Sequence, residues 1–219
     1  MPEELNVADI QMPFLEYRAN YKESITSLWF GLRQGDIVDA FLKALAPQLT
    51  FEGVTWNQAA KNLAEAHISF SLPSLFSTIL VGIRGVTISV LNADWSRIPL
   101  LTSVLQSAVD ALKAGIQKEL EAQQITLAFH LKPGAKAFRE RMTRFVNSKA
   151  LASDDAKSFG VSVYYPDSAF VIDSSGVVPD GLFVKVVRTF SAQKRFEEIA
   201  TVLYKDEEAV LHRLGLKLI

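Results

Sequence analysis

The chain of 219 residues contains no cysteine. Disulfides, cysteine-ligated zinc, iron–sulfur clusters and thiol catalysis are therefore excluded, and a reducing compartment fits this composition. Long apolar runs are also lacking, because none exceeds Ile79–Ile83, far short of the roughly 20 residues that a membrane-spanning helix needs. The polar beginning MPEELNVADIQ does not resemble a signal peptide. We therefore expect a cytoplasmic protein that does not bind a membrane.

Motifs for enzymatic chemistry are missing as well. The three histidines, His67, His130 and His212, have neither the HExxH nor the HxH spacing of metal ligands. The glycines form neither GxGxxG nor GxxxxGK[ST], the loops that hold nucleotide phosphates. Carboxylate clusters such as Asp206-Glu207-Glu208 consist of adjacent residues whose side chains point in different directions on a helix. We therefore interpret them as helix caps and solvated helix faces. We expect no metal and no cofactor, and the sequence favours a protein that is not an enzyme, although catalysis stays open.

The formal net charge of −1 provides no global field that favours nucleic acid. The charge is uneven, however. Residues 1–122 carry 9 basic and 13 acidic side chains, whereas residues 123–219 carry 14 basic and 11 acidic ones. This complementarity favours docking of the two halves or self-association into a dimer.

Basic residues concentrate between positions 132 and 149, where Glu140 is the single acid. Arg139, Arg141 and Arg144 fan around the helical face opposite the apolar residues of this segment, so a solvated helix face is the first interpretation. Nucleic-acid binding through this segment is the alternative.

The most regular pattern is a strand at Val86–Leu91 followed by a long amphipathic helix that ends near Gln123. Pro99 fits only the first turn of a helix, so Ser96 is the expected cap. The apolar stripe recurs in steps of three and four, at Ile98, Leu101, Leu105, Ala108, Leu112, Ile116 and Leu120. Such a stripe needs a sheet to cover.

The remaining elements repeat one order, strand, helix, three strands and helix. Alternating or apolar segments predict strands at Phe14–Tyr21, His67–Leu72, Ser77–Ile83, Ile125–Lys132, Phe159–Tyr165, Ala169–Asp173 and Leu182–Phe190. Helices are expected from Asp36 to Pro47, over Trp56–Glu65, after Pro133, and from Ser191 with a restart at Asp206. Residues 1–13 are expected to form a flexible arm.

This order predicts an α+β fold of two pseudo-repeats, residues 14–122 and 123–219, packed as one globular unit. Their strands would form a curved antiparallel sheet with the long helices on one face, because joining two sheets edge to edge removes an exposed edge. In topology this arrangement resembles the TATA-binding-protein-like fold. The course from Ile68 through Asn92-Ala93-Asp94-Trp95 into the helix is similar to a sporadically distributed bacterial family without an assigned activity. That resemblance covers about half of the chain and implies no site residues.

Candidate binding residues come from aromatic and histidine positions. Trp95 and Arg97 precede the long helix and are candidates for a rim that contacts a partner or small ligand, although a tryptophan closing the core is the simpler interpretation. His130 stands on the polar side of its strand and is the one histidine worth testing. Tyr164 and Tyr165 lie at the end of a predicted strand, where amphipathic rings often make contacts.

Three function classes follow. The first is a non-catalytic interaction or regulatory protein that binds a protein partner, or a second copy, through its sheet surface or helix ends. The second is a small-molecule binder or enzyme with a cavity between sheet and long helices. The third is nucleic-acid binding through residues 132–149, with Arg139, Arg141 and Arg144 as the contacts.

Overall fold

The computed structural model describes residues 6–24, 34–46, 49–57, 65–92, 103, 106–107, 110, 120–132, 160–194, 196–213 and 216–218. Its strands are β1 (Asn6–Tyr21), β2 (Val54–Asn57), β3 (His67–Leu72), β4 (Ser77–Gly82), β5 (Gly85–Leu91), β6 (Leu120–Lys132), β7 (Gly160–Tyr164), β8 (Ser168–Ser174), β9 (Leu182–Ser191) and β10 (Leu216–Leu218). Its helices are α2 (Gln34–Leu45) and α6 (Phe196–Arg213), with 3-10 turns η1 (Phe51–Gly53) and η3 (Pro73–Leu75).

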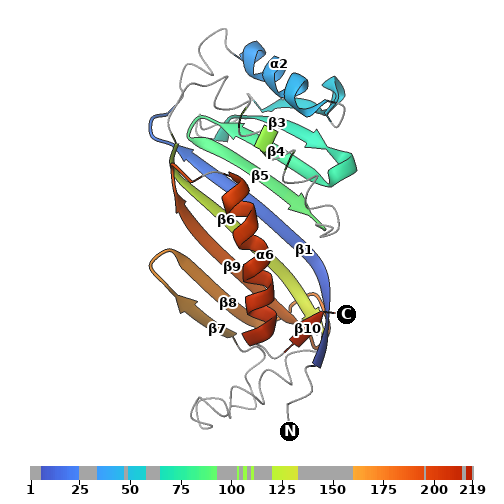
Figure 1. Cartoon of the computed structure of the whole chain (residues 1–219). Coiled ribbons are helices and arrows are strands. Elements are labelled where there is room, and N and C mark those ends of the chain that lie inside the picture. The colour runs from blue at the N-terminus through green and yellow to red at the C-terminus, as the bar shows by residue number, and fades with distance from the viewer. Residues whose placement is uncertain are drawn as a thin grey trace. The chain divides into compact units, whose positions relative to one another are not determined.

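The strands follow the order β2-β3-β4-β5-β1-β6-β9-β8-β7, and β10 pairs with the start of β1 in parallel (Figure 1). The hairpin neighbours β3, β4 and β5, and likewise β7, β8 and β9, pair antiparallel. The strands of these two meanders are confirmed predictions. β3, β4, β5 and the first part of β9 alternate buried and half-buried positions, as the sequence pattern predicts.

The predicted α+β fold with long helices on one face of the sheet is wrong. The described residues are mostly antiparallel sheet, and α2 and α6 are their helices. The helix expected to run to Gln123 overlaps β6, which begins at Leu120. The misread residues are Leu120–Gln123, because Leu120 continues the apolar helical steps that run from Ile98. The pseudo-repeat scheme depended on these helices and is not retained.

Ser103, Gln106, Ser107 and Asp110 of the expected long helix are helical. Nε2 of Gln106 donates a hydrogen bond to Oδ1 of Asp110 over 2.8 Å. The apolar stripe of this helix from Ile98 to Ile116 lies outside the described residues, as does the helix expected after Pro133.

Three local predictions also need correction. Asn6–Pro13 belong to β1 and are no flexible arm, because Asn6–Ala8 pair with β10, a strand that local patterning did not predict. Trp56 and Asn57 pair with β3 and do not start a helix. Helix α6 continues through Asp206 without a restart, because the side chain of Asp206 is paired with Arg188 and does not cap a new helix.

The chain forms two compact units, and each unit is built from segments that are not contiguous in the sequence. Unit 1 consists of Met1–Pro13, Leu127–Arg188 and Val202–Ile219, and unit 2 consists of Phe14–Thr126 and Thr189–Thr201. The predicted boundary between residues 14–122 and 123–219 stays a prediction, although the repeated fold that was expected for these two halves is not retained.

The core of unit 2 lies between its meander and α2. Phe70 of β3 is fully buried and stacks on Phe41 of α2, with ring centroids 4.3 Å apart. Ile37 and Leu45 lie one turn or so on either side of Phe41 and are buried with it, which is the apolar face of an amphipathic helix. None of the described helices combines the length and the apolar character needed to cross a membrane.

Candidate functional site

Strand β9 places a charged residue on its buried face. Leu182, Val184 and Val186 are 3%, 0% and 7% exposed, and their side chains share one face because strand residues alternate. Arg188 is the next residue of this series. A charge at such a position must find a partner, since an unpaired ion out of water is costly.

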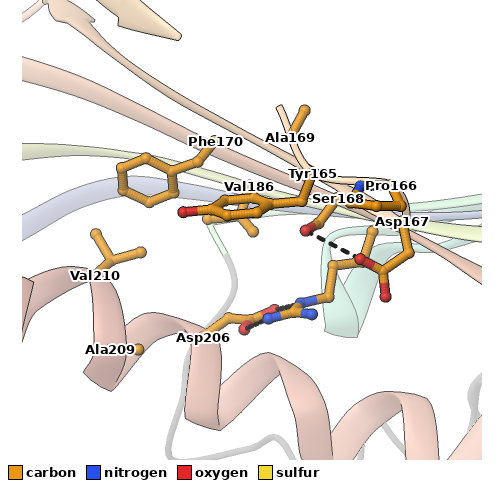
Figure 2. Close-up of a pocket in the computed structure, with 11 residues that line it drawn as sticks. Tyr165, Pro166, Asp167, Ser168, Ala169, Phe170, Val186, Asp206, Ala209 and Val210 are labelled. Carbon is orange, nitrogen blue, oxygen red and sulfur yellow. Dashed lines mark hydrogen bonds and ion pairs between the residues drawn. The ribbon is translucent and has the colours of Figure 1, made fainter. Parts of the chain in front are cut away.

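Helix α6 supplies that partner. Ile199 and Val210 are 0% and 3% exposed, and Asp206, 6% exposed, lies on the same helical face at spacings of seven and four residues. Both carboxylate oxygens of Asp206 accept hydrogen bonds, one from Nε and one from Nη2 of Arg188 (Figure 2). Arg188 of β9 therefore satisfies the carboxylate of this mid-helix aspartate, and α6 continues through Asp206.

The ion pair is bidentate and partly shielded from water. The side chains of Arg188 and Asp206 are 32% and 8% exposed. The hydrogen bond to Asp206 raises the pKa of Arg188, the charge of Asp167 adds to this effect, and partial burial opposes it. Arg188 is thus a permanent cation held in a planar, directed geometry.

A cavity of about 310 Å³ adjoins this pair within unit 1. Its volume lies near the lower end of the range typical of small-molecule sites, about 300–1,000 Å³. Figure 2 shows Tyr165 and Phe170 on the sheet side and Ala209 and Val210 on the helix side. The lining residues are Tyr165, Pro166, Asp167, Ser168, Ala169, Phe170, Val186, Arg188, Asp206, Ala209 and Val210.

The turn between β7 and β8 forms one rim of the cavity. The backbone N–H of Tyr165 donates to the carbonyl of Ser168 at 2.7 Å, and the N–H of Ser168 donates back at 3.4 Å. Pro166 and Asp167 form the loop between them, where proline sets the backbone angle of the turn. The exposed Asp167 accepts a 3.4 Å hydrogen bond from the hydroxyl of Ser168.

His130 belongs to a second polar cluster, at the turn after β8. Oγ of Ser175 accepts the backbone N–H groups of Val177 at 3.1 Å and Val178 at 2.7 Å, and lies 2.9 Å from Nδ1 of His130. Two amide donors occupy the lone pairs of the hydroxyl oxygen, so we assign the hydroxyl as donor to Nδ1 of a neutral His130. Desolvation lowers the pKa of His130, which agrees with the neutral form.

The contacts of Ser175 and His130 stabilise the turn after β8. A serine nucleophile needs a free lone pair on its oxygen, whereas both lone pairs of Ser175 bind amides. His130 also lies against Phe183, with ring centroids 5.3 Å apart. His130 does not line the cavity beside Arg188.

The other predicted site residues, Trp95, Arg97, Arg139, Arg141 and Arg144, lie outside the described residues. Their roles, and nucleic-acid binding by the basic segment, stay predictions. Tyr165, singled out for its place at a strand end, lines the cavity and is 50% exposed.

Sequence reasoning missed Arg188, and it wrongly assigned Asp206 to a cap or solvated face. A signal for both existed: each is a charged residue at a position where the local period requires an apolar one. Two charged residues of opposite sign at expected apolar positions, one on a strand and one on the next helix, indicate a buried ion pair.

Among the described residues, no three histidine, aspartate or glutamate side chains gather as a metal-binding group. No protein-family profile matches this chain, and no curated protein has significant sequence similarity to it.

Proposed function

We propose that this protein binds a small organic molecule in the cavity beside Arg188 and Asp206. The observation that carries the proposal is the position of a bidentate ion pair at the wall of a cavity that is otherwise largely apolar. Small-molecule sites have this composition, with hydrophobic walls and a few convergent polar groups.

The ion pair leaves donors for a ligand. The guanidinium of Arg188 carries more N–H groups than the pair that contacts Asp206, and its fork is rigid. The rings of Tyr165 and Phe170, with Val210 opposite, provide apolar surface for the rest of the molecule (Figure 2).

An ion pair in this position contributes little net stability to the fold. Apolar residues of similar volume often stabilise a fold as well as a buried pair or better, because desolvating two charges is costly. The cavity gives the pair a second use, since polar groups held rigidly at its wall can orient a ligand.

The proposal is tested with a substitution that fills the cavity. Ala209→Phe places a ring into it from α6, and Ala44→Phe makes the same change at an exposed position of α2. A library of small organic fragments is screened against the wild type by ligand-observed NMR and thermal shift. We expect bound fragments to be lost in Ala209→Phe and kept in Ala44→Phe. The proposal fails if the wild type binds no fragment, or if Ala209→Phe keeps all of them.

Strand β7 favours a second candidate function, binding of a protein partner. It ends the strand order and pairs with β8 alone among the described strands. Val163 and Tyr164 are 39% and 75% exposed, which is unusual apolar exposure for an edge strand that carries no charge. We propose that the partner is a second copy of this chain, because two β7 strands can pair antiparallel about a two-fold axis.

Sedimentation equilibrium tests this second candidate. Wild-type protein is expected to dimerise with concentration, and Tyr164→Lys to shift the equilibrium to monomer. Phe51→Lys, at a residue that is 67% exposed in η1, is the matched control and is expected to keep the dimer. A wild type that stays monomeric at high concentration contradicts self-association.

A further inference from the structure

We infer that the cavity selects organic cations, specifically a protonated amine attached to a compact apolar or aromatic body. This inference rests on the proposed function of the cavity and adds the chemical class of its ligand. Charge, geometry and wall composition each support it.

The charges that line the cavity do not balance. Arg188 contributes one positive charge, Asp206 and Asp167 contribute two negative ones, and the other lining residues are uncharged. Asp206 already binds the guanidinium with both oxygens. The unbalanced charge is therefore the carboxylate of Asp167, at the rim.

The surroundings of Asp167 leave it able to accept a ligand. Within the described part of the chain, its hydrogen-bond partner is the neighbouring hydroxyl of Ser168, over a long 3.4 Å. Its charge is close enough to Arg188 to raise the pKa of the arginine, but the two do not form a direct ion pair there. An ammonium group can take the position that a tight partner would otherwise occupy.

Anions are disfavoured at the same place. A carboxylate or phosphate that reached the free N–H groups of Arg188 would lie beside two carboxylates, Asp206 and Asp167, and their repulsion opposes the attraction of the guanidinium. The arginine, neutralised by Asp206, is thus a weak anion site despite its charge.

The walls suit the body of an aromatic amine. Tyr165 belongs to the turn that holds Asp167, and Phe170 lines the same cavity on the sheet side (Figure 2). An ammonium near such ring faces gains about 0.5–1 kcal/mol at exposed sites from cation–π attraction, and an apolar body gains from leaving water.

Three ligands of matched shape and different charge test the inference: 2-phenylethylamine, 2-phenylethanol and 3-phenylpropionate. Dissociation constants are measured by ligand-observed NMR and calorimetry at neutral pH. We expect the amine to bind up to about fivefold more tightly than the alcohol, as one exposed charge pair predicts, and the acid to bind most weakly. Added salt should weaken the amine alone.

Asp167→Asn isolates the proposed charge. This variant should bring the amine to the affinity of the alcohol and leave the alcohol unchanged. Asp39→Asn, an exposed position on α2 with the same change in net charge, should keep the preference of the wild type.

The failures are distinguishable. Equal binding of amine and alcohol, tighter binding of the acid, or an unchanged preference in Asp167→Asn overturns the cation inference. If the alcohol or the acid still binds and Ala209→Phe abolishes that binding, the cavity remains a ligand site of another class. If none of the three binds in a way that Ala209→Phe removes, the inference is overturned and the proposed function loses its support for ligands of this size.

Discussion

Tyr17 donates its hydroxyl proton to Oε1 of Gln123 at 2.7 Å, across 106 residues of sequence. Both residues belong to unit 2, and their side chains are almost completely buried. Nε2 of Gln123 in turn donates to the backbone carbonyls of Ser191 at 2.9 Å and Lys194 at 2.8 Å, in the segment that leads into α6. One glutamine therefore ties β1, β6 and the end of β9 together, and burial raises the pKa of Tyr17 above its ordinary range.

Tyr17→Phe should destabilise the protein by about 1–3 kcal/mol, because it leaves a buried amide oxygen of Gln123 without a donor. Tyr21→Phe is the matched control. Within the described residues the Tyr21 hydroxyl is buried without a hydrogen-bond partner, so its removal should be neutral or stabilising. Urea unfolding measures both. Equal losses in the two variants would show that the hydrogen bond to Gln123 contributes nothing specific.

Breaking the Arg188–Asp206 pair should be costly, and removing both partners much less so. Arg188→Met alone should cost roughly 2–3 kcal/mol, below the usual cost for a fully buried pair because Arg188 is 32% exposed. The double variant Arg188→Met, Asp206→Leu should recover much of this loss, since no unpaired charge remains. A double-mutant cycle by urea unfolding measures the coupling. Additive losses would contradict a coupled pair.

Stability should fall as pH drops below about 6.5, the ordinary pKa of histidine. The folded protein lowers the pKa of His130, so the unfolded chain binds the proton more readily, and the stability from neutral His130 is present above this pH and lost below it. Unfolding is measured at pH 7.5 and 5.5. His130→Asn should reduce the difference between the two pH values, whereas His212→Asn, at an exposed position of α6, should keep it. An unchanged difference in His130→Asn would rule out this histidine as its source.

Gly85→Ala should destabilise unit 2 by about 1–3 kcal/mol, the usual cost of overpacking. A Cβ at this position would lie 2.3 Å from the backbone carbonyl oxygen of Ala19, in the neighbouring strand β1. Gly35→Ala provides the comparison, because its Cβ would meet nothing within 4 Å. Thermal unfolding should separate the two variants clearly. Equal melting temperatures would mean that β1 and β5 can move apart without cost.

The strands were the most predictable part of the fold. His67–Leu72 was predicted with its observed bounds, and β8 and β9 to within a residue at each end, because alternation in a half-buried strand is a local property. β6 was misread at its start, since Leu120 continues a helical apolar step although Gln123, three residues on, is buried in a strand. Local period could not decide between the two structures there.

The candidate site was predictable only in part. Tyr165 was found from its position at a strand end, but Arg188 was passed over within an apolar strand and Asp206 was taken for a solvated acid. Each is a charged residue where the local period predicts an apolar one, but the chemistry of each depends on a partner 18 residues away.

The sequence by itself determined the strands of the two meanders and the helix that contains Asp36, since these depend on neighbours a few residues apart. Only the tertiary structure decided that Asn6–Ala8 pair with β10, that Tyr17 meets Gln123 and that Asp206 closes on Arg188. Contacts between residues far apart in the chain form when hydrophobic burial brings their elements together, and a local pattern carries no record of which elements will meet.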